Sequence, residues 1–106
     1  MAVVEITDRN FDREVLGADR PFILDVSASW CGPCKAFEPV FEEVASQMDG
    51  RAAFGKISID ANPETPQKLG VTSVPTLIIF KEGEQVLRHQ GAMSRDKFVK
   101  KLKEQI

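Results

Sequence analysis

Two cysteines separated by two residues are the part of this sequence best suited to chemistry. They are the only cysteines in 106 residues, and they stand in the hexapeptide WCGPCK as Cys31 and Cys34. Such a pair indicates either a redox dithiol or half of a zinc site. Structural zinc needs four ligands, and the only histidine is the distant His89, so a closed zinc site would require two chains. Two core cysteines that are neighbours by chance are a third interpretation, and we favour the redox pair.

The residues between the cysteines predict that the two sulfurs differ. Pro33 suits the first turn of a helix, where its missing N–H costs nothing, and Gly32 is expected to allow a tight approach. Cys31 would then lie just before the helix, where unpaired N–H groups and the helix dipole stabilise a thiolate. Cys34, one turn later, is expected to be more buried and less readily ionised. We therefore expect Cys31 to attack a disulfide and Cys34 to resolve the mixed disulfide.

An acid within an apolar segment is the second chemical signal. Asp25 lies in the run FILDV, and a buried carboxylate is unfavourable unless it is paired, hydrogen-bonded or protonated. One interpretation is a structural ion pair with Lys56, and the other is a functional group with raised proton affinity. From the residues alone, both interpretations stay open.

The elements that must position these residues alternate along the chain. Apolar runs and two-residue alternation predict strands, while three- and four-residue spacing predicts helices. The predicted strands cover 3–6, 22–28, 54–59, 76–80 and 84–90. Four helices are predicted: a short one that includes Phe11 and Val15, one from Pro33 to Met48, one from Pro63 to Leu69, and one that follows Ser94. This order predicts an α/β fold with a mixed sheet and helices on both faces. The cysteines follow a strand, at the edge where open sheets place their chemistry.

Length and composition exclude several functional classes. A chain of 106 residues is expected to form a single domain, 1–106, with a core that needs no metal. Lysine and arginine number 14 against 16 acidic residues, so no basic surface predicts nucleic-acid binding. Glu5 and Asp8 interrupt the N-terminal apolar residues, and no run is long enough to span a membrane. We therefore expect no membrane association and a cytoplasmic location, where thiols stay reduced.

The chain resembles the thioredoxin family. WCGPCK is similar to the active-site signature of that family, and the resemblance continues through FILDV, PVFEEVA, KISID, SVPTLIIF, KEGE and HQGAMSRDKF. It implies a thioredoxin-like three-layer sandwich in which a mixed sheet of about five strands is flanked by about four helices. It also implies a general protein-disulfide reductase whose only redox group is the Cys31–Cys34 disulfide, with no metal and no other cofactor.

The resemblance also assigns roles to single residues. It implies that Asp25 accepts the proton of Cys34, through water, with Lys56 nearby. It places Val74 and Pro75 in a cis-proline loop that pairs with an extended client backbone, and Gly91 beside that loop. Trp30 adjoins the exposed loop, so its position favours a contact surface over the core. Two positions depart from the pattern, since Ser27 stands where many members have Trp and Ser29 where an acid is common.

Electrons must reach the pair from a partner. The sequence has no G-x-G-x-x-G fingerprint for binding a dinucleotide directly. The resemblance implies a monomer reduced by thioredoxin reductase, with clients such as peroxiredoxins or methionine sulfoxide reductases. There are two alternatives. The first is a glutaredoxin-like transferase that takes electrons from glutathione, and the second is a binding module that works without redox chemistry.

Overall fold

A computed structural model describes residues 2–106 of the chain. Its strands are β1 (Val3–Glu5), β2 (Phe22–Ser27), β3 (Ala53–Ser58), β4 (Thr76–Lys81) and β5 (Glu84–Gln90). Its helices are the short π-helix η1 (Asp12–Leu16), α1 (Gly32–Gln47), α2 (Glu64–Lys68) and α3 (Arg95–Gln105). The described residues thus contain five strands and four helices, which confirms the predicted fold class. Where a range was predicted, the observed bounds differ from it by no more than one residue at either end.

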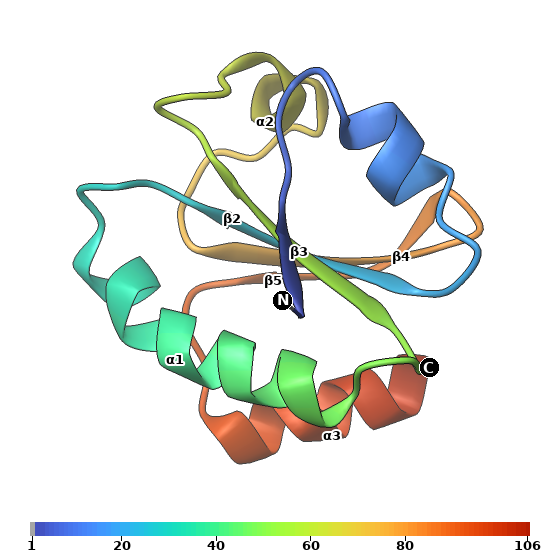
Figure 1. The fold of residues 1–106 in the computed structure, drawn as a ribbon. Coiled ribbons are helices and arrows are strands. Elements are labelled where there is room, and N and C mark those ends of the chain that lie inside the picture. The colour runs from blue at the N-terminus through green and yellow to red at the C-terminus, as the bar shows by residue number, and fades with distance from the viewer. Residues whose placement is uncertain (1) are drawn as a thin grey trace.

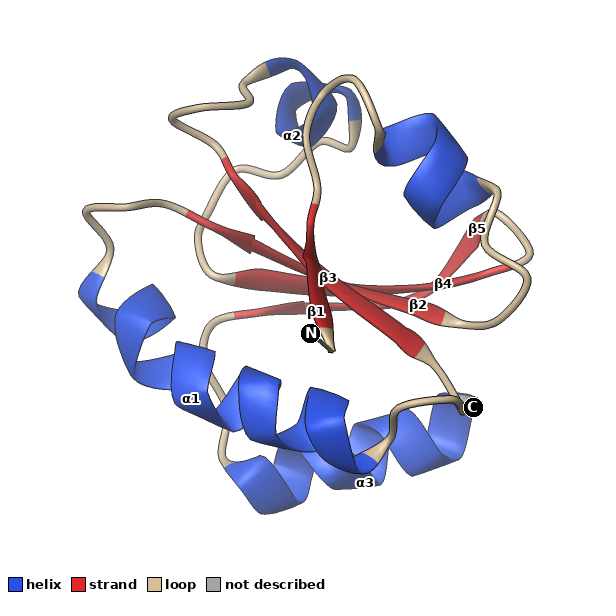
Figure 2. Ribbon diagram, viewed as in Figure 1, coloured by secondary structure: helices blue, strands red, loops and turns tan. Residues whose placement is uncertain are grey.

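The five strands form one mixed sheet in the order β1-β3-β2-β4-β5. Strands β1, β3 and β2 run parallel, and β4 and β5 each run antiparallel to their neighbours. Helices α1 and α3 cover one face of the sheet, while η1 and α2 cover the other (Figure 1; Figure 2 separates helices from strands by colour). The result is the predicted three-layer arrangement of helices, sheet and helices.

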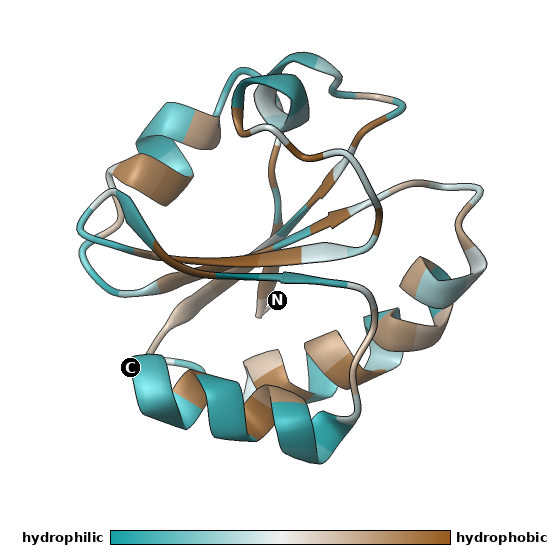
Figure 3. Ribbon diagram, turned by 180° about the vertical axis from the view of Figure 1, so that it is seen from behind, coloured by the Kyte–Doolittle hydropathy of each residue, from teal (hydrophilic) through white to brown (hydrophobic). Residues whose placement is uncertain are grey.

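Each face of the sheet buries its own apolar cluster. Between the sheet and the long helices, Phe98 of α3 stacks on Phe41 of α1 with ring centroids 5.8 Å apart. Figure 3 shows α3 mostly teal, with brown only where its few apolar side chains occur. The opposite face packs against η1 and α2 through a separate set of buried residues: Ile6, Phe11, Val15, Phe22, Leu24, Val26, Ile57, Ile78 and Phe80. Alternation along β2 places Phe22, Leu24 and Val26 in this cluster and Ile23 in the other.

Local hydrogen bonds explain several of the element ends. Ser94 accepts the N–H of Lys97 at 3.2 Å and begins α3 as predicted. Glu82 and Gly83 have φ values of 52° and 81°, the left-handed conformation that a tight β-hairpin turn requires. β4 and β5, which lie where the last two strands were predicted, therefore form a hairpin.

Neither Thr7 nor Asp8, although both are residue types that often cap helices, caps η1. Thr7 Oγ1 accepts the N–H of Asn10 at 3.2 Å, in a turn that precedes η1. The Asp8 carboxylate instead accepts the N–H groups of Glu64 and Thr65, at 3.3 and 2.8 Å. Asp8 therefore caps α2, a helix that begins more than fifty residues later. Among the helices of residues 2–106, none is both long and apolar enough to cross a bilayer.

Candidate active site

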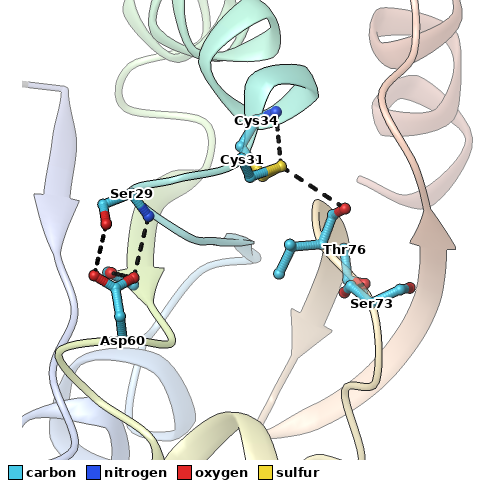
Figure 4. Close-up of a disulfide and its surroundings, with 8 residues drawn as sticks. Ser29, Cys31, Cys34, Asp60, Ser73 and Thr76 are labelled. Carbon is cyan, nitrogen blue, oxygen red and sulfur yellow. Dashed lines mark hydrogen bonds between the residues drawn. A yellow bond between two sulfur atoms is a disulfide. The ribbon is translucent and has the colours of Figure 1, made fainter.

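The two cysteines lie at the N-terminus of α1, on the loop that leaves the carboxyl end of β2. Cys31 is the N-cap of the helix, with an extended backbone (φ −90°, ψ 115°), and its Sγ accepts the N–H of Cys34 at 3.2 Å. The two sulfurs are joined as a disulfide, with the Cα atoms 5.3 Å apart (Figure 4). Gly32 and Pro33 form the start of the helix, as predicted.

The burial of the two cysteines differs from the prediction. Cys34 was expected to be the more buried, but Cys31 is 5% exposed and Cys34 is 4% exposed. In the closed disulfide both pack against Ala28, with Ile59 and Val74 beside them, so burial does not distinguish them. The predicted tight approach at Gly32 is also wrong, because a Cβ there would meet no atom within 4 Å.

The segment Ser73–Thr76 lies beside the disulfide. The Val74–Pro75 peptide bond is cis, as the resemblance implied, and Cys31 Sγ lies 3.9 Å from the carbonyl oxygen of Val74. Gly91 has a φ of 95° and donates its N–H to the Pro75 carbonyl at 2.7 Å. Gly91 therefore adjoins the cis-proline loop, as expected.

Trp30 stands beside a shallow apolar groove. Its side chain is 69% exposed, which confirms that the only tryptophan lies outside the core. A cavity of about 290 Å³ lies next to it, lined by Trp30, Ile59, Val71, Thr72, Ser73 and Val74. The groove thus runs from Trp30 to the residue that precedes the cis-proline.

Asp25 is buried in β2 and is 3% exposed. Its Oδ1 has no hydrogen-bond partner within residues 2–106. Burial, and after it the charge of Glu38, raise the pKa of Asp25 to about 7, against an opposing effect of Lys56. The ion pair between Asp25 and Lys56 that the sequence suggested is not formed, because Lys56 Nζ lies 3.4 Å from Glu38 Oε2 instead.

A second cavity opens on the other side of the cysteines. It has a volume of about 550 Å³ and is lined by Glu5, Ser27, Ala28, Ser29, Cys34, Lys35, Glu38, Lys56 and Ser58. Ser27, one of the two departures from the family pattern, therefore forms part of the wall of a cavity that reaches Cys34. A larger side chain at this position would take up part of that space.

Asp60 is a residue of this region that the sequence analysis missed. Its carboxylate accepts the N–H and the hydroxyl of Ser29, at 3.1 and 2.8 Å, and the hydroxyl of Ser58 at 2.6 Å (Figure 4). These hydrogen bonds, with that from Ser58 first, hold the pKa of Asp60 well below its usual range. A signal was present, since Asp60 follows β3 and the carboxyl ends of the parallel strands β2 and β3 meet at one edge.

Glu38 was also missed, although it comes one helical turn after Cys34 and shares a face of α1 with it. No cluster of three or more potential metal ligands was found among residues 2–106.

Comparison with known proteins completes the description of the site. The family model named Thioredoxin matches residues 2–104. The chain belongs to the thioredoxin family. A thioredoxin of Pseudomonas aeruginosa is 44% identical over 93 residues, which cover 88% of this chain and 86% of the relative.

Thioredoxin 2 of Chlorobaculum tepidum is 41% identical over 96% of the chain and 94% of its own length, and a Mycobacterium tuberculosis thioredoxin is 40% identical over 95% and 87%. Members of the thioredoxin family are thiol-disulfide oxidoreductases, and this chain has their paired cysteines joined at disulfide distance. The chain is therefore a thioredoxin-family oxidoreductase that works by dithiol–disulfide exchange, with the disulfide as its redox group.

Proposed function

We propose that the protein is a general protein-disulfide reductase in which Cys31 is the nucleophile and Cys34 the resolving thiol. The observation that carries this assignment is the position of Cys31 as the N-cap of α1, with its sulfur accepting the N–H of Cys34. A thiolate at that position is stabilised by the N–H group and by the positive end of the helix dipole. Gly32 and Pro33 support the site by starting the helix directly after Cys31.

The reaction has two exchange steps. The Cys31 thiolate attacks a client disulfide, so that a Cys31–client disulfide forms and one client thiolate leaves. Cys34 then loses its proton and attacks Cys31 Sγ, which releases the second client thiolate and closes the Cys31–Cys34 disulfide. Two electrons pass from the dithiol to the client, and the client thiolates take up two protons.

Asp25 is proposed as the acceptor of the Cys34 proton, through water, with Lys56 supporting it. A pKa of about 7 suits a base that must take up a proton and lose it again near neutral pH. Resolution of the mixed disulfide should therefore slow as the pH falls below 7 and Asp25 becomes protonated.

Clients are proposed to bind along the apolar groove beside Cys31. Trp30 would supply an exposed aromatic contact, and the backbone of Val74, before Pro75, would pair with an extended client segment as a strand does. Gly91 adjoins the same loop and has no side chain to obstruct docking. Because backbone hydrogen bonds depend little on the side chains of the client, this arrangement favours broad client specificity.

Membership of the family supports a proposal for the partners. We propose that residues 1–106 act as a single thioredoxin domain, as a monomer in the cytoplasm, without contact with membranes or nucleic acid. A thioredoxin reductase would return the electrons, and peroxiredoxins or methionine sulfoxide reductases are possible clients.

The decisive experiment compares Cys31→Ser and Cys34→Ser with the unchanged protein in the reduction of a protein disulfide. Cys31→Ser should be inactive and form no adduct, whereas Cys34→Ser should accumulate a mixed disulfide visible by mass spectrometry. Equal behaviour of the two variants would contradict the assigned roles. Supplying either thioredoxin reductase with NADPH or glutathione then identifies the electron donor, and turnover with glutathione alone would contradict the proposed partner.

A further inference from the structure

One lysine lies among three carboxylates on the face of the sheet that α1 covers. Strand register places Glu5 beside Lys56 and Lys56 beside Asp25. Residues paired across neighbouring strands point to the same face of a sheet. The row continues from Asp25 to Leu77, which belongs to the core cluster below α1 and α3. Lys56 is therefore flanked by an exposed carboxylate on β1 and a buried one on β2.

The third carboxylate comes from the helix above this row. Lys56 Nζ lies 3.4 Å from Glu38 Oε2, and both side chains are about half exposed. Within residues 2–106 the lysine forms no ion pair with Asp25 or Glu5, and Asp25 Oδ1 has no hydrogen-bond partner. The one cation in the row thus pairs with the helix carboxylate rather than with its strand neighbours.

The lysine has room to pair differently. Glu5, Glu38 and Lys56 line the cavity of about 550 Å³ that also reaches Cys34. A half-exposed ion pair contributes little to stability, because water screens it. Movement of Lys56 toward Asp25 would bring it next to an unpaired carboxyl group but would remove part of its hydration. Ion pairing alone thus gives neither position a clear advantage, so a neighbouring charge can decide between them.

We propose that Glu38 is a positioning residue whose carboxylate holds the Lys56 ammonium group away from Asp25. This inference rests on the proposed function, in which Asp25 accepts the proton of Cys34. Without an ion pair to a cation, Asp25 keeps a high proton affinity and can take up a proton at neutral pH. Loss of Glu38 would let Lys56 approach and keep Asp25 ionised.

The remaining charged groups around Asp25 do not replace this pair. Lys35 of α1 lines the same cavity, but no ion pair joins it to a described carboxylate. On the far side of Leu77, β5 contributes His89. Burial lowers the pKa of His89, and Lys97 and Lys101 of α3 lower it further, so this imidazole is neutral at pH 7.

The test is a titration of the Asp25 carboxyl group by NMR in the oxidised protein, with Glu38→Gln as the variant. Loss of the Glu38 charge and approach of Lys56 should together lower the Asp25 pKa by about one pH unit or more. Glu42→Gln is the matched control, because Glu42 lies on the same helix but lines a separate cavity with Ala2 and Val3. This control should leave the Asp25 titration unchanged.

A second pair of variants separates repositioning of Lys56 from simple loss of charge. In a Lys56→Met background the lysine cannot move, so Glu38→Gln should lower the Asp25 pKa by less than it does in the unchanged protein. An equal decrease in both backgrounds, or no decrease in the single variant, would overturn the proposal.

Activity then distinguishes this inference from the proposed function. In Glu38→Gln, the pH below which mixed-disulfide resolution slows should move down together with the titration of Asp25. If the titration moves and the rate profile does not, Glu38 positions Lys56 as proposed but Asp25 is not the proton acceptor.

Discussion

Asp25 makes the stability of this protein depend on pH in a direction unusual for an aspartate. Burial raises its pKa from the ordinary 3.8 to about 7, so the folded state prefers the protonated form. The favourable contribution of this group is fully present below pH 3.8 and is lost as the pH rises through 7. The gap between the two pKa values corresponds to about 4 kcal/mol at 1.36 kcal/mol for each pKa unit.

Replacing Asp25 by Ala should therefore stabilise the oxidised protein above pH 7, by up to about 4 kcal/mol. At pH 4 the gain should be nearly absent, because the carboxyl group of the folded protein is then neutral. Urea unfolding of both proteins at pH 4 and pH 8 measures the difference. The same difference in unfolding free energy at both pH values would show that the destabilising effect of Asp25 does not come from its ionisation.

At the scale of elements, α2 depends on a residue from a distant part of the chain. The Asp8 carboxylate accepts the N–H groups of Glu64 and Thr65, which lack partners at the start of a helix. Burial opposes ionisation of Asp8, but these hydrogen bonds outweigh it and lower its pKa. Asp8 therefore contributes stability above pH 3.8 that is lost as the pH falls through its folded-state pKa.

We expect Asp8→Ala to lower the free energy of unfolding by about 1 kcal/mol, the usual cost of losing an N-cap. Asp8→Asn keeps an acceptor oxygen, so it should lose less stability and should remove the part of the pH dependence that comes from Asp8. Urea unfolding at pH 3 and pH 7 tests both variants. Full stability of Asp8→Ala at pH 7 would mean that α2 does not need this cap.

The loop before α1 depends in a similar way on Asp60, which accepts both the N–H and the hydroxyl of Ser29. Asp60→Ala removes the acceptor, so the Ser29 N–H should exchange with solvent faster. Hydrogen exchange followed by NMR measures this directly. Asp19→Ala, in an exposed loop elsewhere, is the control, and unchanged protection of Ser29 in Asp60→Ala would contradict the assigned role of the hydrogen bond.

At the scale of the whole molecule, side chains packed on the sheet face that η1 and α2 cover leave no room for a side chain at Gly55. A Cβ on this residue would lie 2.7 Å from a ring carbon of Phe22 and 2.8 Å from a side-chain carbon of Ile6. Gly55→Ala should therefore lower the stability by about 1–3 kcal/mol through overpacking. Gly32→Ala is the comparison, since a Cβ there meets no atom within 4 Å, and equal stability of the two variants would contradict this packing argument.

Local pattern was enough to predict where the strands and helices lie, because the spacing of apolar residues differs between the two. The last strand was predicted at 84–90 and observed as Glu84–Gln90, and α1 was predicted from Pro33 to Met48 and observed as Gly32–Gln47. The cis bond before Pro75 required the family resemblance, because most X-Pro bonds in folded proteins are trans.

The contacts that the sequence did not predict join distant segments. Asp8 and Thr65 are 57 positions apart, and Ser29 and Asp60 are 31 apart, so spacing along the chain carries no sign of either hydrogen bond. The suggested ion pair between Lys56 and Asp25 was wrong for the same reason. Register places Lys56 next to Asp25, and only the position of α1 over the sheet brings Glu38 closer.

The order of the strands has a consequence for synthesis on the ribosome. β1 pairs only with β3, so the first strand to emerge waits about fifty residues for its partner. Phe98 of α3, whose ring centroid lies 5.3 Å from that of Phe37 and 5.8 Å from that of Phe41, is made later still. In the nascent chain, part of the aromatic side of α1 therefore stays uncovered until α3 has left the exit tunnel, and such apolar surface is what chaperones bind.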